Sequence, residues 1–115
     1  MVYYLAIMDE AIKAELNKLK EIIINSVPVK QIFLFGSHAN GTAQKDSDLD
    51  LYVVLKDEAQ MREIDAAIFI REAICEHQSM PLDLLVMKNH RYMERSIAPT
   101  LERKVVREGI LIYGV

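Results

Sequence analysis

The chain has 115 residues, of which 51% are hydrophobic and 27% are charged, a balance that is typical of a globular domain and excludes a disordered or collagen-like chain. Its formal net charge of -3 argues against broad binding to nucleic acids and other polyanions. The one cysteine, Cys75, cannot form an internal disulfide, and no segment approaches the roughly 20 apolar residues of a membrane span.

These features predict a cytoplasmic protein that consists of a single domain over residues 1–115. The apolar opening at residues 2–8 lacks the basic residues that precede the apolar core of a secretion signal. We therefore expect neither secretion nor insertion into a membrane.

Hydrophobic periodicity predicts the elements of the first half in chain order. A helix is expected over about residues 8–25, because apolar residues recur at helical spacing; they are Met8, Ile12, Leu16, Leu19 and Ile23. A continuous apolar run at residues 32–35 predicts a strand that is covered on both faces and ends at Gly36. Residues 36–47 are typical of a loop with room for one short helical turn, and residues 48–55 of a second strand.

The second half continues the alternation of helices and strands. A second long helix is expected over about residues 61–75; its apolar side is marked by Met61, Ile64, Ile68 and Cys75, with Ala67 and Ile74 beside them. A further helix is predicted over residues 98–108, with Pro99 in its first turn and Gly109 just past its end. Two more strands are predicted, at residues 82–87 and 110–113. Helices that alternate with short buried strands indicate a layered α/β fold.

The pattern that carries chemistry is Gly36-Ser37-x10-Asp48-x-Asp50. Because side chains alternate along a strand, Asp48 and Asp50 lie on one face while Leu49 faces the other layer. Two carboxylates about 7 Å apart on one face repel each other unless a cation lies between them. Oxygen ligands of this kind suit Mg²⁺ or Mn²⁺, the cations that also bind substrate phosphates.

The turn before the acids fits a phosphate group. Gly36 lets a phosphate approach the backbone closely, and the hydroxyl and N–H groups around Ser37 can hold phosphate oxygens. The alternative for the two acids is a solvated strand end, because Asp-x-Asp is a common pattern. Their position on a strand that follows a Gly-Ser turn favours the metal and phosphate site.

This motif resembles the signature of the DNA polymerase β-like nucleotidyltransferases, and the chain is most similar to their small minimal branch. The resemblance covers nearly the whole chain, from the first helix to the third strand. It implies a nucleotidyltransferase fold, with a small mixed β-sheet flanked by helices. It also implies transfer of a nucleoside monophosphate, AMP from ATP, to a hydroxyl acceptor with Mg²⁺ or Mn²⁺.

The family uses a third acid on a neighbouring strand, and Asp83 is the one carboxylate within residues 82–87. The resemblance implies that Asp83 binds metal together with Asp48 and Asp50 and acts as general base for the attacking hydroxyl. A charge inside such a strand is costly to bury without a partner. From the residues alone, a strand-end aspartate held by backbone donors or a basic side chain stays an alternative.

The resemblance also assigns the β- and γ-phosphates of the nucleotide to Gly36 and Ser37. Many minimal members carry arginines just after the Gly-Ser pair, whereas this chain has His38 and Asn40 there. His38 can contact a phosphate, and it is equally well explained as a polar loop residue. This departure affects the expected rate and nucleotide preference, and leaves the metal site as it is.

Small members of the family are often paired with a helical HEPN protein, a toxin that the nucleotidyltransferase neutralises by adenylylating it. The resemblance implies this antitoxin role, and we expect a partner protein or a second copy of the chain to complete the acceptor side. Residues 88–108 carry six Lys or Arg against three Asp or Glu, and this basic segment is the candidate partner surface. A solvated helix face is the simpler interpretation of the same charges.

Two other functions stay open. One is a non-catalytic module that masks its partner by contact alone, although three clustered acids would then have no purpose. The other is a nucleotidyltransferase that acts on a small molecule such as an aminoglycoside, for which the chain has little room to build an acceptor pocket.

Overall fold

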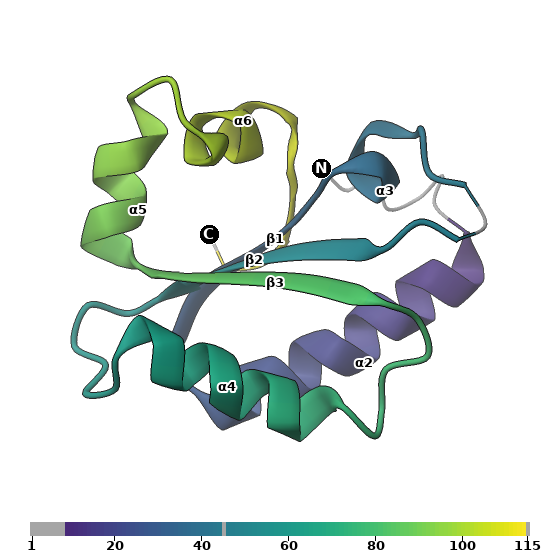
Figure 1. Cartoon of the computed structure of the whole chain (residues 1–115), viewed down its shortest axis with the longest axis horizontal. Helices are drawn as coiled ribbons and strands as arrows, with labels where there is room; N and C mark the ends of the chain where they lie inside the picture. Colours follow the sequence, from purple (N-terminus) through teal and green to yellow (C-terminus); the bar gives the residue numbers. More distant parts are fainter. Residues whose placement is uncertain (1–8, 45, 115) are drawn as a thin grey trace.

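A four-stranded sheet forms the middle layer of the protein (Figure 1). The computed structural model describes residues 9–44 and 46–114, so the apolar opening, including Met8 of the expected first helix, lies outside the described residues. The strand order is β3-β2-β1-β4. The strands are β1 (Val29–Phe35), β2 (Leu49–Leu55), β3 (Leu82–Lys88) and β4 (Ile110–Tyr113).

The sheet is mixed, as the family resemblance implies. β1 is antiparallel to both β2 and β4, whereas β2 and β3 are parallel. Parallel neighbours need a crossover connection, and α4 (Glu63–Ile74) supplies it between β2 and β3. The expected layered fold with a small mixed sheet flanked by helices is therefore confirmed.

Helices cover both faces of the sheet (Figure 1). α2 (Glu10–Ser26) and α4 lie on one face, and α3 (Ser37–Asn40), α5 (Asn89–Ser96) and α6 (Leu101–Glu108) lie on the other. The two-sided cover explains the continuous apolar runs of β1 and β2, because both faces of these strands pack against helices. The strand expected at residues 32–35 is confirmed and begins three residues earlier, at Val29.

The first helix follows its predicted pattern. Its inner stripe includes Leu16, Leu19 and Ile23, and all three side chains are buried in the larger core cluster between this helix and the sheet. The carboxylate of Asp9 caps the helix by accepting a hydrogen bond of 2.7 Å from the Ala11 N–H. The cap fixes the start of the helix and so supports the predicted boundary.

The predicted apolar side of α4 is wrong at Ile64 and Ile68, whereas Ile74 is buried as expected. The helix buries Ala66, Ile70 and Ile74, whereas Ile64 and Ile68 are half exposed. Cys75 lies at the end of this helix and is exposed, so its expected core position is also wrong. Apolar residues occur on more than one side of α4, so periodicity alone could not decide which side packs on the sheet.

The segment after β3 also differs from the prediction. α5 was not expected, because its eight residues are polar apart from Tyr92 and Met93 and show no apolar stripe. α6 begins at Leu101 rather than at residue 98, because Thr100 serves as its N-cap and Pro99 lies before the cap. Gly109 follows the end of α6 as predicted, and β4 confirms the last expected strand.

Within residues 9–44 and 46–114, no helix has both the length and the apolar character that crossing a bilayer requires.

Candidate active site

The site begins at the turn that follows β1. Gly36 has a φ angle of 75°, a left-handed conformation that side chains with a Cβ rarely adopt. A Cβ atom at this position would lie 2.1 Å from Oδ2 of Asp50. The N–H groups of Ala39 and Asn40 both donate to the Gly36 carbonyl at 3.1 Å and hold the turn closed. Glycine at this position therefore allows the turn and the aspartate to touch.

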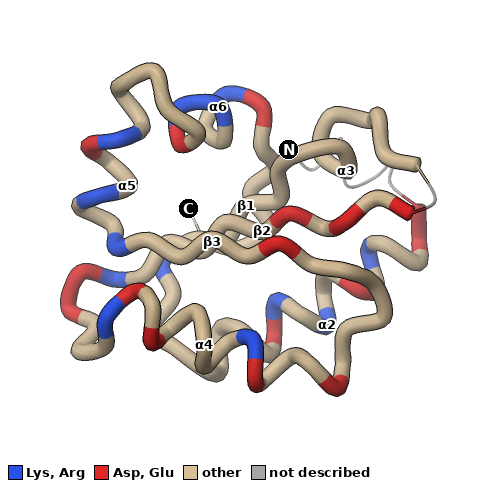
Figure 2. Tube along the Cα trace, in the orientation of Figure 1, with Lys and Arg blue, Asp and Glu red and all other residues tan. Residues whose placement is uncertain are grey.

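Asp50 and Asp83 lie side by side on parallel strands. They are direct partners in the register of β2 and β3, so their backbones are one strand spacing apart, about 4.8 Å. Leu49 and Leu51 on the other face of β2 are fully buried, as the alternation predicts. Asp50 is partly buried, and Asp48 and Asp83 are exposed. Figure 2 shows acidic residues gathered where β2 and β3 begin.

The three acids crowd negative charge into this corner. Burial raises the pKa of the Asp50 carboxyl, and its hydrogen bond and charge interaction with Asp83 and the charge of Asp48 raise it further. The charge of His38 lowers the same pKa. Such mutual repulsion is the electrostatic condition that a bound cation would relieve.

The loop residues singled out in the sequence lie around the same corner. The Nε2–H group of His38 donates to the carbonyl of Ser47 at 3.1 Å, and the ring interacts with the charge of Asp50. Ser37 is partly exposed at the turn. The amide oxygen of Asn40 accepts from the Thr42 N–H at 3.0 Å. Gly36, Ser37 and His38 are thus grouped near Asp50, whereas the Asn40 oxygen closes its own loop.

The acidic residues around Asp50 do not form a complete metal-binding site on their own. Across the parts of the chain that the structure describes, no three His, Cys, Asp or Glu side chains are close enough together to hold a metal ion. The direct pairing joins Asp50 to Asp83, and Asp48 lies at the exposed entrance to β2.

Comparison with known protein families shows to which family the chain belongs. Residues 17–115 match the family model described as polymerase beta, nucleotidyltransferase. The chain belongs to this nucleotidyltransferase family. A protein of Methanocaldococcus jannaschii named "Putative protein adenylyltransferase MJ1379" is 32% identical over 92 residues, which cover 78% of this chain and 91% of that protein.

Solved structures share the fold of this nucleotidyltransferase. A mutant of the toxin–antitoxin pair MntA-HpeT superposes with a TM-score of 0.61 at 25% identity, covering 86% of this chain and 72% of that one. A toxin–antitoxin structure with AMP-PNP superposes with a TM-score of 0.58 at 24% identity, covering 86% of this chain and 73% of that one. The expected fold is therefore confirmed.

The donor set of the nucleotidyltransferase suits a hard divalent cation. Mg²⁺ in nucleotide sites is usually held by one or two carboxylates together with the phosphates of the substrate. The Asp50–Asp83 pair supplies two such carboxylates without a third preformed ligand. The residues therefore fit Mg²⁺ or Mn²⁺, with the substrate completing the coordination.

One feature beside the site was missed by the sequence analysis. A cavity of about 200 Å³ lies next to Gly36, and α6 contributes Leu101, Lys104 and Val105 to its lining. These residues follow Gly36 by more than sixty positions in the chain. No local pattern connects them to the Gly-Ser turn, so only the packing of α6 could reveal the contact.

Proposed function

We propose that this nucleotidyltransferase transfers AMP from ATP to a hydroxyl group of a partner protein and depends on Mg²⁺ or Mn²⁺. The observation that supports it most is the side-by-side position of Asp50 and Asp83, with the carboxylate of Asp50 against Gly36. This places a cation-binding pair next to a turn that a phosphate group can approach. Asp48 adds charge at the entrance to the same corner.

Each residue has a proposed role in an in-line displacement. Gly36, Ser37 and His38 are assigned to the β- and γ-phosphates. Asp50 and Asp83, with Asp48 at the entrance, would hold the divalent cation. A cation held there would neutralise phosphate charge and make the acceptor hydroxyl easier to deprotonate. Asp83 accepts the proton of that hydroxyl. The acceptor oxygen bonds to the α-phosphorus, the bond from this phosphorus to the β-bridging oxygen breaks, and pyrophosphate leaves.

The names of the similar proteins support a protein acceptor. The Methanocaldococcus jannaschii relative bears the name of a protein adenylyltransferase, and two structures with the same fold are of toxin–antitoxin pairs. One of these pairs was crystallised with AMP-PNP, an analogue of ATP. We therefore propose a helical HEPN-type toxin as the partner and an antitoxin role for this chain.

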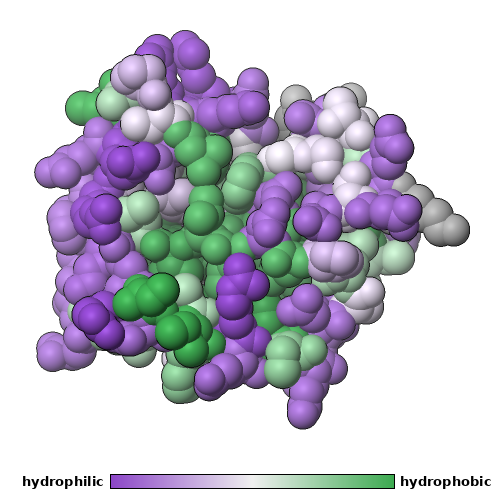
Figure 3. All heavy atoms as spheres, viewed as in Figure 1, coloured by the Kyte–Doolittle hydropathy of each residue, from purple (hydrophilic) through white to green (hydrophobic). Residues whose placement is uncertain are grey.

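The surface offers two features for a partner. Basic residues follow α5 and α6 (Figure 2), and Arg103 and Arg107 are exposed without an ion pair among the described residues. Apolar surface lies along the open edge of β3 and over α4 (Figure 3), where Ile64, Ile68 and Leu85 are at least 40% exposed. Exposed apolar surface rimmed by polar residues is typical of protein contact sites.

The decisive experiment asks which phosphorus of ATP, α or γ, is transferred to the acceptor. The purified protein is incubated with Mg²⁺, a lysate of the native host and ATP that is labelled at either the α- or the γ-phosphorus. We expect a protease-sensitive species to take label from the α position alone. Asp50→Asn should abolish labelling, whereas Asp46→Asn, which removes an exposed carboxylate four residues upstream, should retain it.

The other outcomes discriminate among functions. A folded Asp50→Asn variant that still transfers AMP would overturn the assignment of the site. A labelled small molecule would favour an antibiotic-type acceptor. A partner that co-purifies without ever taking label would favour masking by contact.

The basic surface is tested in the same assay. Arg103→Glu combined with Arg107→Glu reverses two exposed charges on α6, and we expect it to lower labelling of the acceptor protein by at least about tenfold. Binding of ATP should stay unchanged. Unchanged labelling would remove this surface from the partner interface.

A further inference from the structure

The cavity beside Gly36 has two unlike walls. One wall comes from the turn after β1 and includes Phe35, Gly36 and Asn40; the other comes from α6 and includes Leu101, Lys104 and Val105. Figure 1 shows α3 and α6 on the same face of the sheet, on either side of the end of β1. The cavity therefore opens next to the turn to which we assign the triphosphate.

The lining combines an apolar interior with a polar rim. Val105 is 1% exposed and belongs to the core cluster on this face, and Phe35 packs against the same cluster. Asn40 and Lys104 are exposed. The Lys104 ammonium lies 3.9 Å from the Glu108 carboxylate, a loose pair that leaves it available to another acceptor. Flat ligands with apolar faces and a polar edge match such a lining.

The size restricts the ligand. A volume of about 200 Å³ is below the roughly 300–1,000 Å³ of pockets that enclose whole drug-sized molecules. The cavity thus admits one ring system while the rest of the ligand lies outside. A nucleotide whose phosphates are at Gly36 and Ser37 presents its base as that ring system.

We propose that this cavity takes the purine base of the donor nucleotide, with Lys104 donating a hydrogen bond to an acceptor on the edge of the ring. The proposal rests on the proposed function and adds to it a base-binding site formed by α6. Phe35 and Leu101 contact the faces of the ring, because bases stack between aromatic and apolar side chains, and the buried Val105 closes the cavity behind them.

The test places large side chains in the cavity by substituting lining residues that are exposed, because such positions can accept a larger side chain without disturbing the core. Leu101 is 39% exposed and lines the cavity, and Lys104 lines it with an exposed side chain. Val106 is on the same helix, is 51% exposed and does not line the cavity. Leu101→Trp and Lys104→Trp therefore place an indole at the cavity, and Val106→Trp is the matched control on the other side of α6.

Binding of ATP and of inorganic tripolyphosphate, each with Mg²⁺, is measured by calorimetry. We expect Leu101→Trp and Lys104→Trp to weaken ATP binding by about tenfold or more, the scale of losing one base contact. Tripolyphosphate has no base, so its affinity should stay within about threefold. Val106→Trp should change neither.

Three results would overturn the proposal. In the first, both cavity variants bind ATP as the unchanged protein does. In the second, they lose tripolyphosphate and ATP equally, which assigns the cavity to phosphates. In the third, the unchanged protein binds tripolyphosphate and ATP with equal affinity, which leaves no contribution from a base. If the unchanged protein binds neither ligand, the proposed function fails as well, whereas the first three results leave it standing.

Discussion

Gly36 is constrained twice, by its own backbone and by the carboxylate of Asp50. Its φ angle of 75° disfavours any residue with a Cβ, and the contact with Asp50 forbids the Cβ itself. Gly41 shares the first constraint, with a φ of 82°, but a Cβ there meets nothing within 4 Å. A substitution at Gly41 therefore tests backbone strain alone, whereas a substitution at Gly36 also displaces the Asp50 carboxylate.

We predict that Gly41→Ala loses about 1–2 kcal/mol, because it forces alanine into the left-handed region. Gly36→Ala should lose more, because a φ of 75° with a ψ of -154° is a conformation that only glycine adopts readily, and the new Cβ also meets Asp50. Only Gly36→Ala should also lose AMP transfer, since the new methyl group pushes the Asp50 carboxylate out of place. Chemical denaturation measures the first effect and the labelling assay the second. Equal activity in the two variants would contradict the assignment of Asp50.

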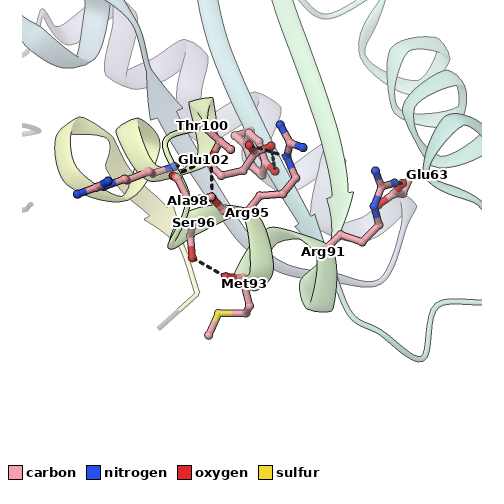
Figure 4. A network of polar contacts seen from close by, with 10 residues as sticks. Glu63, Arg91, Met93, Arg95, Ser96, Ala98, Thr100 and Glu102 are labelled. Carbon is pink, nitrogen blue, oxygen red and sulfur yellow. Dashed lines mark hydrogen bonds and ion pairs between the residues drawn. The ribbon is translucent and has the colours of Figure 1, made fainter.

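Among the elements, α5 and α6 are fastened to the sheet by a buried polar network. The Tyr52 hydroxyl donates to Oε2 of Glu102 at 2.8 Å, and Nε of Arg95 donates to Oε1 of Glu102 at 2.8 Å. Figure 4 shows Arg95 and Glu102 pointing toward each other from the two helices. The network joins β2, α5 and α6, the last of which also lines the cavity beside Gly36.

Removing the Tyr52 hydroxyl should loosen this attachment. Tyr52→Phe leaves one oxygen of the buried Glu102 without its donor, and we predict a loss of about 1–3 kcal/mol in the free energy of unfolding. Tyr92 stacks on Phe33 at 5.8 Å between ring centroids, and its hydroxyl makes no hydrogen bond within residues 9–44 and 46–114. Tyr92→Phe should therefore change stability by less than about 0.5 kcal/mol. Urea denaturation compares the two, and equal losses would argue against the network.

The orientation of α4 is tested by two isoleucines on one helix. Ile70 is fully buried and Ile68 is 50% exposed. We predict that Ile70→Ala costs about 2–5 kcal/mol, because it leaves a cavity in the core, and that Ile68→Ala costs less than about 0.5 kcal/mol. Thermal or denaturant unfolding measures both. A larger loss for Ile68→Ala than for Ile70→Ala would mean that the side of α4 predicted from the sequence is the one that packs on the sheet.

On the scale of the whole molecule, two buried carboxylates, Glu15 and Glu102, join segments that are far apart in the chain. On the α2 side, Glu15 accepts the Ser79 N–H at 2.7 Å and pairs with Lys18 at 2.9 Å. Burial raises the pKa of Glu15, but the hydrogen bonds from Ser79 and Lys18 outweigh it and hold the pKa below its usual value. Burial of Glu102 is likewise outweighed by Tyr52 and Arg95, so its pKa is also lowered.

These lowered pKa values predict acid sensitivity. Above the ordinary glutamate pKa of 4.5, both groups are ionised and their stabilisation is complete. As the pH falls further, the unfolded chain binds protons first, and stability is lost while the pH falls through the lowered native pKa values. We expect Glu15→Gln combined with Glu102→Gln to be less stable near about pH 7 and to lose less on acidification. Melting temperatures from about pH 7 to about pH 3 test this, and parallel curves would refute it.

The elements and part of the site could be predicted because their signals are local. The stripe of α2, the apolar run of β1 and the alternation of β2 depend on neighbours within a few residues. The spacing from Gly36 to Asp50 likewise lies within one turn and one strand. The start of α6 was misplaced because Pro99 and Thr100 are both helix-start residues, and only the capping hydrogen bond from the Arg103 N–H distinguishes them.

By itself, the sequence determined that this protein is a layered α/β chain with a Gly-Ser turn followed by two acids on one strand face. The tertiary structure decided that β2 and β3 pair in parallel, which places Asp83 beside Asp50. It also decided which side of α4 is buried and that α6 closes a cavity next to Gly36. The physical reason is range: periodicity and turn chemistry act between near neighbours, whereas strand pairing and helix packing bring together residues that no local signal connects.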